Sequence, residues 1–143
     1  RDLGASIGLE NDNDIFVWNV IFEGPADTLY EEAIGKLSTK VFMQIINLLA
    51  GGYFKAQLKF PNDYPNNPPE MRFVTKMGTQ TVSEFLRRNL ALVYENGKVC
   101  ISILHPPGVD PLNPLERADE RWRPILGVEA ILLSVISMLN SPN

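Results

Sequence analysis

The sequence is poor in cysteine and histidine, two residue types that often act in catalysis or bind metals. It has one cysteine, Cys100, and one histidine, His105, among 143 residues. A single cysteine excludes a disulfide within the chain, and no Cys/His pair recurs at a metal-ligand spacing. We therefore expect a reducing compartment and no structural zinc or other metal. The 13 basic residues are outnumbered by 17 acidic ones, which leaves a net charge of −4 and no basic block. This balance argues against nucleic acid as a partner.

Long apolar runs are also missing. The longest, residues 41–50, is interrupted by Gln44 and Asn47 and is too short to span a bilayer. The first six residues contain no apolar signal-peptide core. We expect a soluble protein of the cytoplasm or nucleus that does not span a membrane, with peripheral association with the endoplasmic reticulum through partners left open. A hydrophobic content of 45% predicts one domain, residues 1–143, with one core.

Three segments predict an antiparallel β-meander. Residues 15–22 are rich in β-branched and aromatic side chains, and residues 53–60 alternate between polar and apolar ones, so that one face meets a core. Residues 71–75 form the third strand, after a loop at 61–69 whose four prolines make it rigid.

Helical spacing appears in three places. Near the end of the chain, Pro124 suits a first helical turn, and apolar residues then recur at every third or fourth position from 128 to 139, which predicts a helix packed on the sheet. Residues 38–50 and 83–92 predict two further helices outside the meander. The expected fold class is α+β.

Cys100 is the first candidate for chemistry. The turn signal at Glu95-Asn-Gly97 precedes residues 98–104, which have the composition of an extended segment. Taken alone, this window leaves two interpretations open, a nucleophilic thiol or a small buried hydrophobic side chain. His105 lies five residues later, and an extended chain would carry it far from the sulfur. We therefore interpret His105 as a structural or loop-positioning residue and not as a general base.

Several motifs, taken together and in this order, resemble those of the ubiquitin-conjugating enzymes. They cover most of the chain, and the acidic segment at 106–120 is similar to that of the subgroup with an acidic insertion after the active-site cysteine. The motifs are YFKAQLKFPNDYP at 53–65, Pro68-Pro69, GKVCISILH at 97–105 and ERWRP at 120–124.

The resemblance implies that Cys100 accepts ubiquitin as a thioester from an activating enzyme and passes it to a lysine of a substrate protein, with the help of a ubiquitin ligase. No cofactor is bound, and ATP is used by the upstream activating enzyme. The resemblance also implies roles for two further sets of residues. The acidic loop contains Asp110, Glu116, Asp119 and Glu120, and the ligase-binding set is Pro61, Tyr64, Pro65, Pro68, Trp122 and Pro124. For both sets a purely structural or solvated role is the alternative.

The chain departs from the family pattern in three ways. The family's His-Pro-Asn motif reads Leu90-Ala-Leu92 here, so the asparagine that stabilises the oxyanion is replaced by a leucine. Residues 32–50 and 78–92 are expected to be atypical insertions. Both ends are shorter than in the family, from which we expect a truncated domain and weaker charging by the activating enzyme. The alternative function is a catalytically impaired variant that acts as a ligase- or ubiquitin-binding module.

Overall fold

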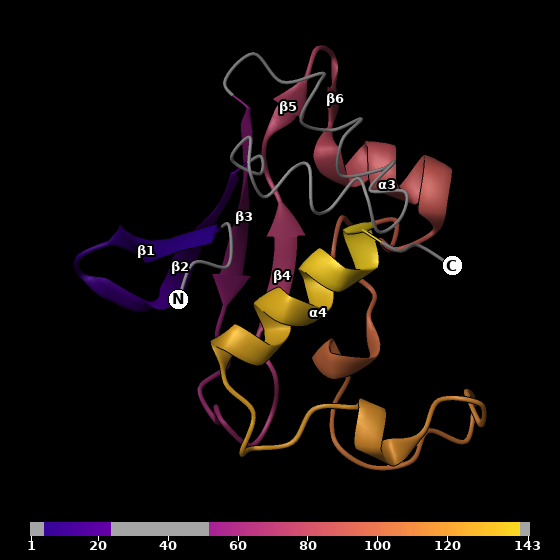
Figure 1. The fold of residues 1–143 in the computed structure, drawn as a ribbon. Coiled ribbons are helices and arrows are strands. Elements are labelled where there is room, and N and C mark those ends of the chain that lie inside the picture. Colours follow the sequence, from indigo (N-terminus) through magenta and orange to yellow (C-terminus); the bar gives the residue numbers. More distant parts are fainter. Residues whose placement is uncertain (1–4, 24–51, 141–143) are drawn as a thin grey trace.

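The chain folds around a four-stranded antiparallel sheet that is crossed on one face by a helix (Figure 1). The computed structural model describes residues 5–23 and 52–140. The strands lie side by side in chain order: β1 (Ala5–Asn11), β2 (Asp14–Glu23), β3 (Tyr53–Lys59) and β4 (Glu70–Phe73). The predicted meander and the α+β class are confirmed. Strand β1 was not predicted, because its sequence has only one β-branched residue and a glycine at its centre.

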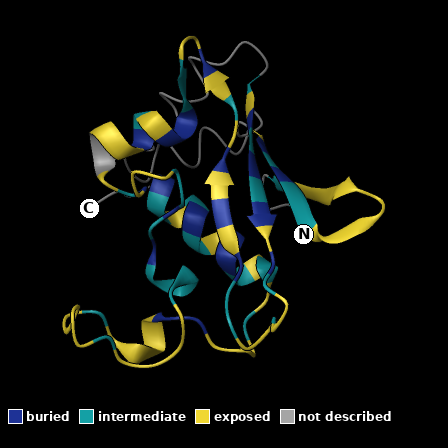
Figure 2. Cartoon of the chain, turned by 180° about the vertical axis from the view of Figure 1, so that it is seen from behind, coloured by how far each residue is buried: buried dark blue, intermediate teal, exposed yellow. Residues whose placement is uncertain are grey.

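The core lies between this sheet and helix α4 (Val128–Asn140), as the buried residues in Figure 2 show. In β3 the predicted alternation is confirmed, because Phe54, Ala56 and Leu58 are fully buried. The apolar stripe of α4 contributes four buried residues to the same core, namely Ile131, Leu132, Val135 and Leu139.

Helix α4 begins later than Pro124 suggested. Pro124 is exposed in the preceding loop, where the N–H of Leu126 donates to the carbonyl of Arg123 at 2.9 Å. The helix starts at Val128, after Gly127, whose carbonyl oxygen accepts the first helical hydrogen bonds. The prediction that Pro124 stands in the first turn is therefore wrong, because the loop makes its own turn before the helix begins.

The segment at 78–92 builds a second small unit at the end of the sheet. A hairpin of β5 (Lys76–Met77) and β6 (Gln80–Thr81) leads into helix α3 (Val82–Leu90), which confirms the helix predicted there. The helix begins with a capping box: the Thr81 hydroxyl accepts from the N–H of Glu84 at 3.1 Å, and the Glu84 carboxylate accepts from the N–H of Thr81 at 2.7 Å.

Helix α3 is anchored in the core. Val82 and Leu86 are buried, and the buried hydroxyl of Ser83 donates to the carbonyl of Phe73 in β4 at 2.8 Å. The helix predicted at 38–50 and the insertion predicted at 32–50 lie outside the described residues.

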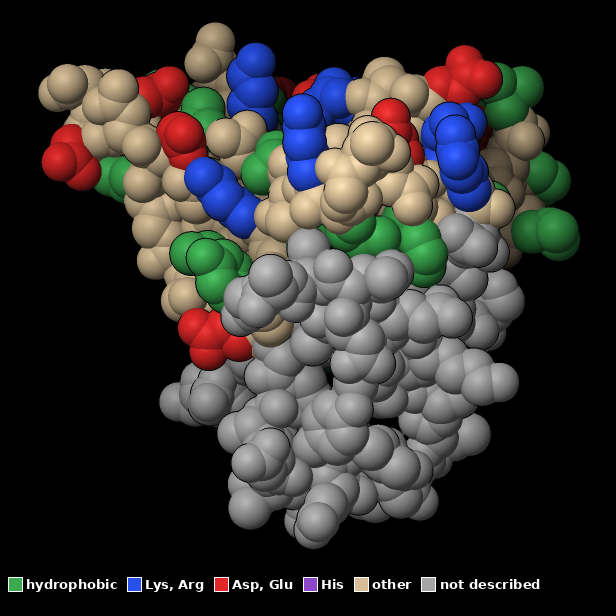
Figure 3. Space-filling model, turned by 90° about the horizontal axis from the view of Figure 1, so that it is seen from above, with side chains coloured by type: hydrophobic (Ala, Val, Ile, Leu, Met, Phe, Trp, Pro, Cys, Tyr) green, Lys and Arg blue, Asp and Glu red, His purple; other side chains and the backbone are tan. Residues whose placement is uncertain are grey.

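The described surface is mixed in charge. On the face seen from above in Figure 3, lysine and arginine side chains stand among aspartate and glutamate side chains. Within residues 5–23 and 52–140, no helix has both the length and the apolar composition needed to cross a membrane.

Candidate functional site

The predicted turn at Glu95-Asn-Gly97 is confirmed, and it holds the backbone of Cys100 in place. Gly97 has φ +89°, and the N–H of Tyr94 donates to the carbonyl of Lys98 at 2.9 Å. After the turn, the N–H of Val99 donates to Met71 in β4 at 2.8 Å, and the N–H of Cys100 donates to the carbonyl of Leu92 at 2.7 Å. Cys100 is therefore fixed to the sheet on one side and to the end of the 78–92 segment on the other.

The prediction of an extended segment from 98 to 104 is wrong in its second half. Residues Ser102–Leu104 form a 3-10 helix, η1, and the N–H of His105 donates to the carbonyl of Ser102 at 3.0 Å. A 3-10 helix rises about 2 Å per residue, compared with about 3.3 Å in a strand, and it also turns the chain.

This turn brings His105 back to the cysteine. Its Nε2 lies 4.0 Å from the sulfur of Cys100, whereas we expected it to be too distant for proton transfer. The prediction that His105 lies beyond reach of Cys100 is therefore wrong, and the argument that excluded it as a general base no longer holds. A contact of this length is a loose hydrogen bond to sulfur.

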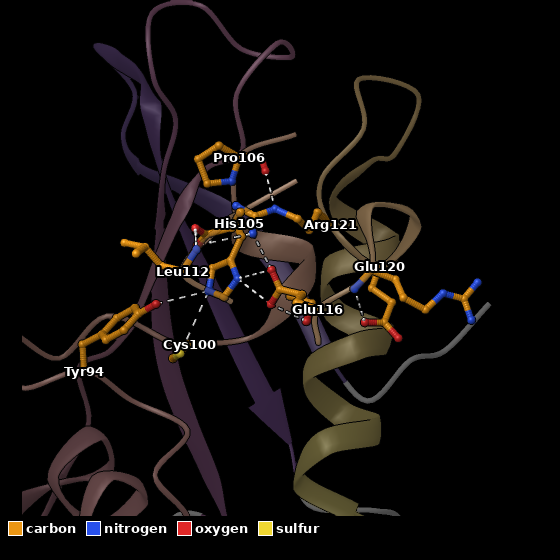
Figure 4. A network of polar contacts seen from close by, with 11 residues as sticks. Tyr94, Cys100, His105, Pro106, Leu112, Glu116, Glu120 and Arg121 are labelled. Atoms are coloured by element: carbon orange, nitrogen blue, oxygen red, sulfur yellow. Dashed lines mark hydrogen bonds and ion pairs between the residues drawn. The ribbon is translucent and has the colours of Figure 1, made fainter. Parts of the chain in front are cut away.

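Glu116 orients the His105 ring (Figure 4). The two carboxylate oxygens lie 3.0 and 2.8 Å from Nδ1 of His105. Because the ionised carboxylate only accepts hydrogen bonds, the Nδ1–H of His105 donates to it, and Nε2 faces the sulfur of Cys100 and the Tyr94 hydroxyl, whose oxygen is 3.2 Å from Nε2. Glu116 also accepts hydrogen bonds from Ser102 at 2.8 Å and from Arg121 at 2.6 Å.

Two groups in this network have shifted proton affinities. Burial of Glu116 favours its protonated form, but hydrogen bonds from His105 and Ser102 and the charges of His105 and Arg121 outweigh this effect, so the pKa of Glu116 is lowered. A hydrogen bond to Cys100, burial and the negative charges of Cys100 and Glu116 raise the pKa of Tyr94 to about 12. Glu116 is therefore ionised at neutral pH, and the Tyr94 phenol keeps its proton.

The four residues of the predicted acidic loop lie in different environments. Only 7% of the Glu116 side chain is exposed, because it points inward at His105. The others lie nearer the surface, each close to an arginine: Asp110 is 3.9 Å from Arg121, Asp119 pairs with the side chain of Arg117, and Glu120 accepts from the N–H of Arg117 at 3.2 Å. The loop therefore folds around its own arginines, which partly neutralise its negative charge.

The predicted ligase-binding residues lie on two neighbouring loops that Trp122 joins. Its indole N–H donates to the carbonyl of Pro65 at 2.7 Å, and its ring centre is 5.9 Å from that of Tyr64. Trp122 is fully buried, which favours the structural role that was left open for it over contact with a ligase. Its backbone N–H donates to the carbonyl of His105 at 3.1 Å, which makes it a positioning residue for the site.

The remaining members of that set are at least partly accessible. Pro65 and Pro124 are exposed, and Pro61, Tyr64 and Pro68 are half-buried. Their contact with a ligase stays a prediction.

Leu92, at the position of the family's asparagine, faces the core. It is half-buried and lines a small apolar space together with Leu86, Val99 and Val135. On the open side of the site, a groove of about 470 Å³ runs past Tyr94, Lys98 and His105. The arrangement therefore offers a half-buried thiol, a histidine held by a carboxylate and a protonated phenol beside an open groove, but no hydrogen-bond donor at position 92.

The positions of Tyr94, His105 and Glu116 beside Cys100 were not predicted from the sequence. The Asn-Gly turn could have indicated that residues 92–94 lie across from residues 98–100, which would have put Tyr94 near the cysteine. Nothing in the sequence predicts that the Glu116 side chain points inward, because the sequence does not distinguish it from the other three acidic residues of the loop.

Comparisons with known proteins agree with these observations. The family model described as ubiquitin-conjugating enzyme matches residues 45–143. The chain is 44% identical over 140 residues to "Ubiquitin-conjugating enzyme E2 7" of Arabidopsis thaliana, and the aligned region covers 98% of this chain and 66% of that protein. It is 45% identical over 140 residues to "Ubiquitin-conjugating enzyme E2 15" of Schizosaccharomyces pombe, covering 98% and 65%. The chain therefore spans just under two thirds of the length of these relatives.

Solved structures show the same likeness. The structure of human ubiquitin-conjugating enzyme E2 G1 matches with a TM-score of 0.60 and 41% identity, over 97% of this chain and 81% of that one. A ubiquitin-conjugating enzyme E2 from Plasmodium falciparum matches with a TM-score of 0.56 over 99% and 87%, and at 24% identity it supports the fold alone.

Proposed function

Because the chain belongs to the ubiquitin-conjugating enzyme family, we propose that it accepts ubiquitin as a thioester on Cys100 and transfers it to a lysine of a target protein. The observation that carries the proposal is the contact of 4.0 Å between the sulfur of Cys100 and Nε2 of His105, whose ring is held by Glu116. A nucleophile, a base and a group that orients the base form the arrangement that activates a thiol.

In the loading step, the Cys100 thiol gives its proton to Nε2 of His105, and the sulfur attacks the carbonyl carbon of the incoming ubiquitin thioester. The Glu116 carboxylate stabilises the imidazolium that forms, as the acidic member of a catalytic triad does. The imidazolium then passes its proton to the leaving thiolate, which stays with the activating enzyme as a thiol. Cys100 then holds the C-terminus of ubiquitin.

The partners follow from this reaction. Ubiquitin, a ubiquitin-activating enzyme, a ubiquitin ligase and a substrate lysine each take part. The chain itself binds no cofactor, and ATP is consumed by the activating enzyme. The exposed and half-buried residues of the proline-rich loop, with Pro124 beside it, are the surface proposed for the ligase.

The test is a charging assay with activating enzyme, ATP and ubiquitin, analysed on gels with and without reducing agent. Cys100 is the only cysteine of the chain, so an adduct that a thiol reagent cleaves reports on this residue directly. We expect such an adduct in the parent chain, a thiol-resistant ester in Cys100→Ser, and no adduct in Cys100→Ala. A parent chain that forms no adduct while a known conjugating enzyme is charged in the same reaction would refute the proposal.

A further inference from the structure

The transfer step needs a hydrogen-bond donor that the family motif does not supply here. When an amine attacks a thioester, negative charge develops on the carbonyl oxygen, and a donor aimed at that oxygen lowers the barrier. The side chain of Leu92 has no polar hydrogen and packs on core residues. The side-chain oxygen of Asn96 accepts from the N–H of Lys98 at 3.0 Å, which holds this side chain against the turn.

Tyr94 has the required properties. Its hydroxyl is 3.2 Å from Nε2 of His105, and His105 in turn contacts the sulfur of Cys100. The phenol therefore lies beside the atom to which the thioester would be attached, as Figure 4 shows. Its raised pKa, about 12, means that it carries a hydrogen throughout the neutral range.

We propose that Tyr94 replaces the missing asparagine, and that its phenol donates a hydrogen bond to the oxyanion formed when a lysine amine attacks the Cys100 thioester. This inference rests on the proposed function. The His105–Glu116 pair holds the phenol at the sulfur before the reaction, and rotation about the phenol C–O bond redirects its hydrogen from Nε2 to the oxyanion.

The step balances without any further reactant. The amine nitrogen forms a bond to the carbonyl carbon, and the π electrons of the carbonyl move to its oxygen, where Tyr94 donates. Nε2 of His105, no longer occupied by the phenol, takes a proton from the nitrogen. The oxyanion collapses, the C–S bond breaks and its electron pair leaves on the sulfur of Cys100. The imidazolium returns the proton to that sulfur, which lies 4.0 Å away, and the products are an amide and a free thiol.

The groove of about 470 Å³ provides an approach for the amine. Tyr94 and His105 both line it, so an acceptor side chain lying in the groove reaches the thioester from the side of the proposed donor and base. At its rim, Lys98 forms an ion pair with Glu70 at 2.9 Å.

The experiment measures discharge separately from loading. The chain is charged chemically, by thiol exchange with ubiquitin that carries a small-molecule thioester at its C-terminus, and the charged protein is mixed with free lysine. Tyr94→Phe is compared with the parent, and Tyr53→Phe, an exposed tyrosine in β3 outside this network, is the matched control. Tyr94 is 47% exposed, so its substitution should leave the fold intact, which circular dichroism checks.

We expect Tyr94→Phe to lower the maximal discharge rate about 100-fold, with the half-saturating lysine concentration unchanged, because a lost oxyanion donor affects the transition state and not lysine binding. Tyr53→Phe should match the parent. If the parent, loaded with ubiquitin, discharged at the same rate as Tyr94→Phe, or never transferred ubiquitin to lysine, this inference would be overturned while the proposed function would stand. Failure of the activating enzyme to charge the parent would instead refute the proposed function.

Discussion

Replacing Leu86 by alanine tests whether the 78–92 segment belongs to the core. Leu86 lies in the middle of α3 and is 1% exposed, and it lines the same apolar space as Val135 of α4. The substitution removes three buried carbon atoms, which at about 0.8 kcal/mol each amounts to about 2.4 kcal/mol of lost burial. The cavity left behind adds to this, and we expect a total loss of about 3 kcal/mol in the free energy of unfolding.

The assay is urea unfolding followed by far-ultraviolet circular dichroism. With an m value of about 2 kcal/mol/M, the transition midpoint should fall by about 1.5 M without a change in slope. Arg88→Ala on the exposed side of the same helix is the matched control, and it should change the free energy by less than about 0.5 kcal/mol. If Leu86→Ala unfolded at the midpoint of the parent, α3 would not be packed as described, and the account of the 78–92 segment would be refuted.

Three further substitutions test individual interactions that hold the site and α3 in place. Trp122→Phe removes the hydrogen bond to Pro65 and should lower the free energy of unfolding by about 2 kcal/mol in urea titrations; a loss below about 0.5 kcal/mol would contradict the anchoring role. Glu116→Gln should lower the free energy of unfolding at neutral pH but not in acid. The lowered pKa of Glu116 stabilises the folded protein at pH values above the ordinary glutamate pKa, and this stability is lost as the pH falls through the folded-state pKa. A difference in unfolding free energy between parent and variant that stays constant from pH 7 to 3 would refute this prediction. Thr81→Ala should cost about 1 kcal/mol through the lost helix cap, while Thr79→Ala in the adjacent turn should cost almost nothing; equal effects would exclude the capping box.

The regular elements could be predicted because their patterns are local. The alternation of residues 53–60 and the apolar stripe of α4 follow from side-chain periodicity, and both are found as expected. The Asn-Gly turn before Cys100 is also local, and its glycine adopts the positive φ that it was expected to supply. The hairpin at 76–81 was not predicted, because each of its strands is only two residues long.

The candidate site could be predicted only in part, because its geometry depends on contacts between distant residues. Cys100 was found from its motif, but the position of His105 depends on a short 3-10 turn whose sequence, Ser-Ile-Leu, looks like a strand. For Trp122 the sequence left ligase contact and a structural role open, since a tryptophan in a loop motif carries no local sign of what covers it, and the side chain is buried. Glu116 could be distinguished from its acidic neighbours only from the three-dimensional course of the loop backbone.

The hydrogen bond from the N–H of Cys100 to the carbonyl of Leu92 has a consequence for how the site opens. Leu92 lies two residues after the end of α3, so the backbone at Cys100 and this helix form parts of one cooperative unit. Transient local unfolding of the helix would release the Cys100 amide to solvent, whereas fluctuation of the acidic loop would not. The amide hydrogen of Cys100 should therefore exchange with deuterium at a rate that follows α3 rather than the exposed loop at 106–120, whereas that of Val99, bonded to Met71, should follow β4.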